Sequence, residues 1–305
     1  MQTVKRIPLF LFLVIALTSL AAPSQAQSQT SSAASLAKPL RDVYLYWRKA
    51  MVSKNYNAWK QITASHRQAA IKNRILSEKG SFPADVFKLP GSPPSLEGLK
   101  MLRSRSKGGT AKLVCFGKVD FGIGGDPSDN LLVLSYVYEG RGWKYDTAEF
   151  INLGGLKDVR TQLKSGDLEY INNEAFMPDG KRPVQPVTVQ RAKYIAKVYA
   201  FCPGREVRVT VNKISRHRFQ DTQQSEVVIG GALDSMNSIR YFIKDLPGYK
   251  GDDPLTIRVY VFSQIPGVKP VKIFQYQTAK GVKPKLSGSA TFNLPSAVSA
   301  KILGK

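Results

Sequence analysis

Residues 131–152 read LLVLSYVYEGRGWKYDTAEFIN, and this stretch decides the fold of the first half of the chain. Two apolar runs flank Gly140-Arg141-Gly142, and glycines on both sides of one residue permit the positive φ angles of a tight β-hairpin. The first run is apolar at odd and even positions, as expected of a strand covered on both faces. The second alternates between aromatic and charged residues. We therefore expect a hairpin inside a packed sheet.

Helical periodicity surrounds this hairpin. Apolar residues recur at helical spacing in segments 40–53 and 55–76, which predicts two amphipathic helices. Segment 111–122 alternates like another strand, and segment 152–173 has a helical pattern interrupted at Gly166. Helices followed by a few antiparallel strands and a further helix indicate an α+β domain, with helices packed on a small curved sheet.

Two short motifs in this region resemble NTF2-like (cystatin-like) domains. The aromatic segments YLYWRKA (44–50) and KNYNAW (54–59) are similar to the opening of that fold, and GWKYD (142–146) looks like the late hairpin of its exported members. The resemblance covers residues 39–177. It implies a pocket inside the curved sheet, where enzymes of the superfamily use an acidic residue, a tyrosine or a histidine, although many members only bind or scaffold. The matching candidates here are Tyr145, Asp146 and Glu149.

The pattern changes after PDGKRPVQP (178–186), a proline-rich segment that we interpret as a linker. Beyond it, short apolar runs are separated by glycine and proline turns, which predicts an antiparallel, immunoglobulin-like sandwich over residues 187–295 that resembles no particular family. The tail, 296–305, is either a short helix or disordered. The expected strands are 194–202, 206–214, 226–233, 239–244, 255–262, 271–277 and 287–294.

The first residues have the composition of an export signal. Lys5 and Arg6 precede an uncharged apolar run of about 16 residues, shorter than the roughly 20 of a spanning helix. Ser24-Gln25-Ala26 places small residues where a signal peptidase accepts them. We expect cleavage after residue 26, a flexible leader over 27–38, and a protein without a membrane span that is periplasmic, attached to the cell surface or secreted. The sequence has no Asn-x-Ser/Thr sequon, which favours a bacterial envelope.

The chain is strongly basic, with 45 Lys and Arg against 22 Asp and Glu and a formal net charge of +23. This excess favours anionic partners such as lipid headgroups, acidic glycans or nucleic acid. The alternative is a general basic bias, in which solvated lysines serve solubility alone. Because export separates the protein from the genome, we predict no specific nucleic-acid partner. Oligomeric state is left open by the sequence.

Residues for hydrolytic or metal chemistry are scarce. His66 and His217 are the only histidines and fall in different predicted domains, where both are expected to be exposed, so a Ser-His-Asp site is not supported. Without clustered ligand spacing we expect no metal site, and no motif indicates a cofactor. Cys115 and Cys202 form either one inter-domain disulfide or two buried free thiols.

A different signal lies in two of the predicted strands of the sandwich. In each, basic and aromatic residues alternate with aliphatic ones, so that neighbouring strands would bring both kinds of side chain to one sheet face. Such a face suits an anionic glycan, because rings stack on apolar ring faces and cations neutralise acidic groups. The alternative is a face buried against the first domain. The residues concerned are Arg258, Tyr260, Phe262, Lys272, Phe274 and Tyr276.

Taken together, these patterns predict a two-domain exported protein of the cell envelope that binds or scaffolds, with an anionic glycan or an envelope protein as its partner. The alternative is a pocket in the NTF2-like domain that carries a small ligand or performs isomerase- or dehydratase-type chemistry. Whether the chain is an enzyme stays open, with the side chains favouring binding.

Overall fold

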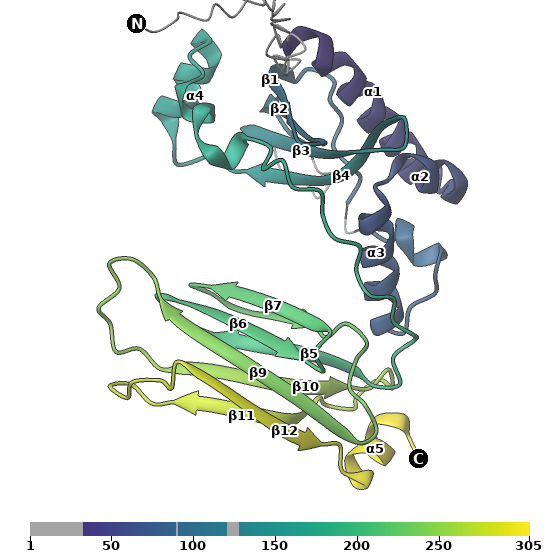
Figure 1. Ribbon diagram of the computed structural model, residues 1–305, viewed down its shortest axis with the longest axis vertical. Coiled ribbons are helices and arrows are strands. Elements are labelled where there is room, and N and C mark those ends of the chain that lie inside the picture. The colour runs from purple at the N-terminus through teal and green to yellow at the C-terminus, as the bar shows by residue number, and fades with distance from the viewer. Residues whose placement is uncertain (1–32, 90, 121–127) are drawn as a thin grey trace, which may run out of the picture.

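The computed structural model describes residues 33–89, 91–120 and 128–305 (Figure 1). Its first half contains helices, then one four-stranded antiparallel sheet in sequential order, then a further helix and two short 3-10 turns. The helices are α1 (Ala33–Val52), α2 (Tyr56–Ile62), α3 (Ser65–Ser77), η1 (Ala84–Phe87), α4 (Lys157–Ser165), η2 (Glu169–Asn172) and η3 (Glu174–Phe176). The strands are β1 (Lys100–Lys107), β2 (Thr110–Lys118), β3 (Asp129–Glu139) and β4 (Gly142–Ile151).

This first sheet is covered on both faces, as the apolar run of β3 predicted. On one face, Leu36, Leu40 and Tyr44 project from one side of α1 at a spacing of four residues and join a buried cluster with β2, β3 and β4. On the other face, Leu163 of α4 and Phe176 of η3 pack against alternate residues of β2 and β3. The hairpin forms between β3 and β4, where Gly140 has a φ of 62°.

Two expectations about helix ends are corrected. Helix α1 begins at Ala33, so the predicted flexible leader 27–38 is wrong for its last six residues, whereas residues 1–32 lie outside the described part. Helix α4 ends at Ser165 because Gly166 adopts a φ of 93°, and the predicted helical segment continues only as the 3-10 turns. Within the described ranges, no helix is both long and apolar enough to cross a bilayer.

The second half is β-rich. Its eight strands form two four-stranded antiparallel sheets, ordered β11-β10-β5-β8 and β12-β9-β6-β7, which pack face to face around one core (Figure 1). Residues 177–193 connect the halves without regular structure, and the predicted division into two domains there remains a prediction. The strands are β5 (Ile195–Phe201), β6 (Arg205–Val211), β7 (Ser215–Gln220), β8 (Gln223–Val227), β9 (Met236–Asp245), β10 (Leu255–Phe262), β11 (Val271–Thr278) and β12 (Ser287–Asn293).

The predicted strand over 206–214 is wrong in its last residues, because β6 ends at Val211 and a separate strand, β7, begins at Ser215. The chain reverses at Asn212 and Lys213, whose φ angles of 50° and 61° form a tight turn without glycine. In the tail, α5 (Ser296–Leu303) forms the helix that was one of the two expectations, and its Ile302 is buried in the core between the sheets.

The disulfide alternative is wrong, because both cysteines are free and buried. Cys115 lies in the cluster beneath α1, and Cys202 lies in the core between the two C-terminal sheets. The alternative of two buried thiols is the one that the structure bears out.

Helix α3 joins the two halves of the molecule (Figure 1). The Asn73 amide donates to the carbonyl of Val187 (2.7 Å) and accepts from the amide of Val189 (3.2 Å). The Ser77 hydroxyl donates to the carbonyl of Asn73 (2.6 Å) and accepts from the amide of Gly230, in the loop after β8 (2.8 Å). Asn73 and Ser77 are 2% and 0% exposed, so both side chains depend on these protein partners for their hydrogen bonds. We call the contacts made by these two side chains the α3 clamp.

We expect Asn73→Ala to destabilise the chain by about 1–3 kcal/mol, because the buried amide of Val189 and the carbonyl of Val187 lose their partner. Urea unfolding followed by circular dichroism measures the loss. Asn57→Ala, which removes an exposed asparagine of α2, is the matched control and should stay within about 0.5 kcal/mol of wild type. Equal stabilities for the two variants would show that the clamp contributes nothing.

Candidate functional site

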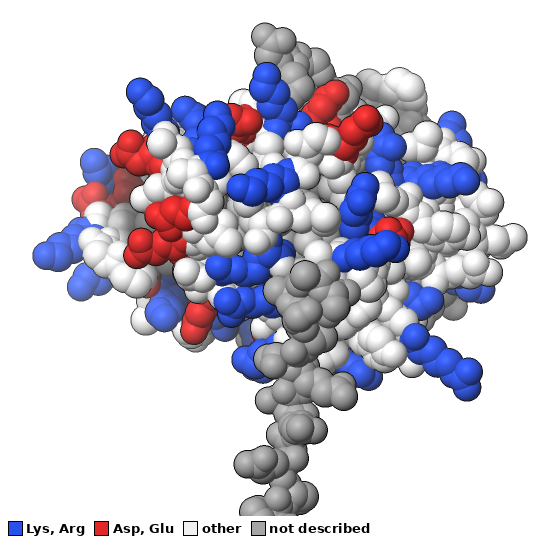
Figure 2. All heavy atoms as spheres, turned by 90° about the horizontal axis from the view of Figure 1, so that it is seen from above, with Lys and Arg blue, Asp and Glu red and all other residues white. Residues whose placement is uncertain are grey.

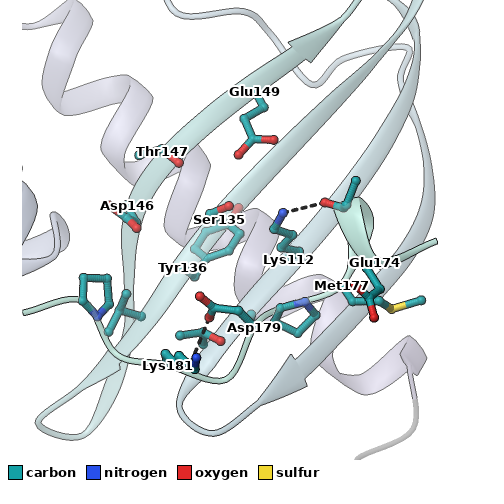
Figure 3. A pocket seen from close by; sticks show the side chains of 16 residues that line it. Lys112, Ser135, Tyr136, Asp146, Thr147, Glu149, Glu174, Met177, Asp179 and Lys181 are labelled. Atoms are coloured by element: carbon teal, nitrogen blue, oxygen red, sulfur yellow. Dashed lines mark hydrogen bonds between the residues drawn. The ribbon is translucent and has the colours of Figure 1, made fainter. Parts of the chain in front are cut away.

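A cleft of about 360 Å³ lies on the face of the first sheet opposite α1 (Figure 3). Strands β2, β3 and β4 form its floor, and the segment 174–183 crosses in front of them. The Lys112 ammonium donates to the carbonyl of Ala175 (2.7 Å), which ties this segment to the floor. In a basic protein the cleft is acidic, with four carboxylates and two ammonium groups. Its charged side chains are Lys112, Asp146, Glu149, Glu174, Asp179 and Lys181.

The three pocket candidates from the sequence are divided between the two faces of the sheet. Ser135 pairs with Thr147 and Tyr136 with Tyr145, so Asp146 is the extra residue of a β-bulge. Asp146 lines the cleft, together with Glu149 at its exposed rim. Tyr145 is 5% exposed and lies on the α1 face. Asp146 and Glu149 therefore share a site, and Tyr145 lies outside it.

Aromatic rings fill the space between α1 and the sheet, where the NTF2-like resemblance implies a pocket. The ring centroid of Tyr145 lies 4.0 Å from Trp47, 5.6 Å from Tyr44 and 6.2 Å from Tyr136. Burial raises the pKa of Tyr44 and Tyr145 well above the usual value, so both phenols stay protonated. Ring packing of this density leaves the cleft on the opposite face as the better place for a small ligand.

His66 of α3 contacts the bulge residue. Its Nε2 lies 2.9 Å from Oδ1 of Asp146, and the two side chains are 14% and 15% exposed, so the expectation of an exposed His66 is wrong. Asp146 Oδ1 nevertheless makes no well-directed hydrogen bond. The two side chains are therefore in close polar contact without an aligned hydrogen bond between them. Tyr136 Oη and Thr63 Oγ1, whose residues both pair with Tyr145, are likewise buried without a hydrogen-bond partner among the described residues. The bulge thus concentrates unsatisfied polar atoms, which is unusual for a purely structural core.

The second histidine is buried and belongs to a chain of hydrogen bonds that ends at the partly exposed Glu226. His217 Nδ1 lies 2.9 Å from a carboxylate oxygen of Glu226, and its Nε2 lies 2.8 Å from the hydroxyl of Ser215. Because a carboxylate only accepts, Nδ1 carries the proton and neutral Nε2 accepts from Ser215. The side chain of His217 is 2% exposed, so the expectation of an exposed residue is again wrong. An acid, a histidine and a hydroxyl therefore meet, contrary to the expectation from the sequence.

This Ser-His-Glu arrangement lacks the surroundings that hydrolysis requires. Ser215 is 1% exposed and its Oγ already accepts the amide of Ile229 (2.7 Å), so a substrate carbonyl has no approach to it. Strand β7 is an edge strand of one C-terminal sheet and β8 is an edge strand of the other, and the hydrogen-bond chain joins them. We interpret it as a structural connection between sheet edges rather than a catalytic triad.

The basic and aromatic residues predicted on one sheet face are partly separated. Strands β10 and β11 are neighbours, as expected, but Ile273 is the extra residue of a second bulge, since Phe274 pairs with Val259 and Lys272 with Tyr260. Phe274 and Tyr276 therefore turn inward and pack against the core, so their predicted surface position is wrong. Arg258, Tyr260, Phe262 and Lys272 share the outer face, where all four are half-buried or exposed rather than covered by the first half.

Two further residues of β5 lie on this outer face in addition to the predicted ones. Tyr199 and Lys197 of β5 pair with Arg258 and Tyr260, which places them beside the predicted residues. The Arg258 guanidinium lies 6.0 Å from the Tyr199 ring centroid and donates to Gln275 Oε1 (3.1 Å). The sequence IAKVYAF (195–201) could have predicted their position, because Lys197 and Tyr199 alternate with small residues that are buried.

Positive charge is not gathered in one place on the first half. Figure 2 looks onto that end of the molecule and shows Lys and Arg side chains spread over the visible surface, with fewer Asp and Glu among them. The distribution of charge therefore does not indicate a binding site. Ion pairs and the geometry of individual side chains are more informative. Among the described residues, no group of three His, Cys, Asp or Glu side chains converges as a metal site requires.

We expect stability to fall as the pH drops below about 6.5, because burial lowers the pKa of His217 below that of the unfolded chain, which then binds more protons. The Glu226 carboxylate opposes this shift. Glu226→Gln should therefore lower the pKa of His217 further and steepen the loss of stability between pH 6.5 and 5. Urea unfolding at several pH values measures it, with His217→Gln as the variant in which this contribution disappears. A shallower slope in Glu226→Gln would contradict the interpretation.

Two surfaces thus present organised chemistry: the acidic cleft with the His66–Asp146 contact, and the basic and aromatic outer face of β10, β11 and β5. Comparison with protein-family models, with curated proteins and with solved structures finds no match for the chain.

Proposed function

We propose that this protein is an exported, non-catalytic binding protein of the bacterial cell envelope that recognises an anionic glycan through the outer face of β11, β10, β5 and β8. Export rests on the charge and apolar pattern of residues 1–26, and the envelope rests on the lack of sequons. The observation that carries the binding proposal is the organisation of that face into two rows of polar and aromatic side chains.

The rows result from strand register. One row runs across the four strands as Gln275, Arg258, Tyr199 and Ser225, and the next as Lys272, Tyr260, Lys197 and Val227. Directly opposed residues of antiparallel strands are close enough for their side chains to interact. The two rows together contain arginine, lysine, glutamine and tyrosine but no carboxylate.

Contacts within the rows hold the binding groups in place. The Arg258 guanidinium donates to Gln275, Gln277 and the Tyr260 hydroxyl at 3.1, 3.1 and 3.3 Å. The Lys197 ammonium lies 5.2 Å from the Phe262 ring centroid. Side chains fixed in this way lose less conformational entropy when a ligand binds. Amide and phenol groups suit sugar hydroxyls, and the cations suit carboxylate or sulfate groups.

At the level of fold, we propose an NTF2-like first domain and a β-sandwich second domain. Helix α1 packed along one face of an antiparallel sheet supports the first proposal. For the second, the strand order differs from an immunoglobulin constant domain, whose first and second strands share a sheet. Here β5 lies beside β8 and β10, and β6 lies beside β7 and β9. We therefore propose a β-sandwich whose strand order differs from that of an immunoglobulin constant domain.

We expect the purified chain to bind acidic members of a glycan array at about 0.15 M salt, where non-specific attraction between charges is screened. Tyr199→Ala with Tyr260→Ala should lower affinity for the best ligand at least tenfold, because the stacking surface is lost while the net charge is unchanged. Tyr46→Ala, an exposed tyrosine on α1, is the control and should bind as wild type does. Unaltered binding by the double variant, or an array without any ligand, would exclude a glycan on this face.

A second candidate function is a small-ligand site with isomerase- or dehydratase-type chemistry in the acidic cleft. The observation that favours it is the His66 imidazole 2.9 Å from Oδ1 of Asp146, a residue that lines the cleft and whose Oδ1 lacks an aligned hydrogen bond. Such a carboxylate is placed to remove a proton from a bound compound.

For that function, we expect wild type to catalyse solvent-deuterium exchange into small ketones, and Asp146→Asn to lower the rate about 100-fold or more because the base is lost. Proton NMR monitors the exchange. Glu149→Gln at the exposed rim is the control that should retain most of the rate. If deuterium exchange with wild-type protein is no faster than in buffer alone, the cleft does not catalyse proton removal from these ketones.

A further inference from the structure

The sheet on the other side of the core has a different outer face. Strands β12, β9, β6 and β7 carry a surface hollow of about 810 Å³, lined by three cations, several hydroxyls and no carboxylate. We call it the arginine groove. Its cations are Lys213, Arg216 and Arg240, and its hydroxyls include those of Thr210 and Ser289.

Register places the main groups of the arginine groove in one row. Thr210 pairs with Arg216 on one side and with Arg240 on the other, and Arg240 pairs with Ser289. Because neighbouring strands lie about 4.8 Å apart, the backbones of Arg216 and Arg240 are about 10 Å apart. Thr210 lies on the strand between them. Both are exposed, so their guanidinium groups are accessible from solvent.

Pairing sets these cations apart from others on the same face. Arg208 and Arg218 both bind Glu206, at 2.5 and 2.7 Å, and are neutralised in part by it. None of the ion pairs formed by the described residues includes Lys213, Arg216 or Arg240. A ligand entering the groove therefore displaces no protein carboxylate from them.

The third cation is held by the turn between β6 and β7. Asn212 and Lys213 both have left-handed φ angles, a conformation that asparagine adopts more readily than most residues. Asn212 fixes the turn against β9: its amide nitrogen donates to Asn237 Oδ1 (2.9 Å), and its Oδ1 accepts from the amide of Ser238 (2.9 Å). The backbone of Lys213 is therefore held in a defined position next to Arg216 and Arg240.

We propose that the arginine groove binds phosphate groups, carried either by a soluble compound or by a lipid headgroup. Two unpaired guanidinium forks, one ammonium and intervening hydroxyls match an anion that carries two or more charges and several acceptor oxygens. A single carboxylate would neutralise only one of the three cations. The groove lies on the sheet opposite the glycan face, so this proposal does not rest on the proposed function.

Calorimetric titration of the full chain with inorganic pyrophosphate at about 0.15 M salt tests the proposal. We expect Arg216→Gln with Arg240→Gln to weaken binding at least tenfold. Arg216→Lys with Arg240→Lys should give an intermediate affinity, because charge is kept and the bidentate fork is lost. The control, Lys280→Gln with Lys283→Gln, removes the same charge from exposed positions outside the groove and should bind as wild type does.

Flotation with phosphatidylcholine vesicles, with and without phosphatidylglycerol, separates the two sources. Binding to the anionic vesicles that is lost in the arginine-to-glutamine variant assigns a lipid headgroup, whereas pyrophosphate binding alone assigns a soluble phosphate compound. Absence of binding to both probes overturns the proposal. So does an equal loss in the arginine-to-glutamine variant and the lysine control, because net charge alone would then explain the attraction. Circular dichroism confirms that every variant is folded.

Discussion

The α3 clamp is the interaction on which the arrangement of this molecule depends. Asn73 and Ser77 hold the connecting chain and the loop after β8, and both contacts are made to main-chain groups. The adjoining residue of that loop, Ile229, donates to Ser215, so the clamp continues into the His217–Glu226 connection between the sheet edges. Because the first half is attached through loops and edges, both outer faces of the C-terminal sheets are left uncovered.

Those two faces are chemically different although they enclose one core. Alternation along each strand sends aliphatic residues inward and leaves the outward positions free to vary. On one sheet these positions hold tyrosine, glutamine and a hydrogen-bonded arginine, and on the other they hold unpaired arginines beside hydroxyls. The first combination suits a ligand with apolar ring faces, and the second suits a compact multivalent anion. The two faces therefore differ in how their cations are paired, which the net charge of the chain does not reveal.

Much of the fold was predictable because it depends on local patterns. Periodicity and turn residues indicate the hairpin at Gly140, the early helices and the change to strands after residue 186. The errors have specific causes. Asp146 and Ile273 are extra residues in their strands, and each reverses the inward and outward alternation of its strand, which separated Tyr145 from Glu149 and Phe274 from Lys272. The turn at Asn212 lacks glycine, and contacts such as His66 with Asp146 join segments far apart in sequence.

The positions of the two cysteines limit the thiol chemistry of the chain. Burial raises the pKa of Cys115 to about 12 and that of Cys202 above its usual value, so neither sulfur is an effective nucleophile at neutral pH. Each thiol is enclosed in a different core. Folding therefore needs no disulfide formation or disulfide isomerase, and material refolded from denaturant under strongly reducing conditions should be the same molecule as material prepared in air.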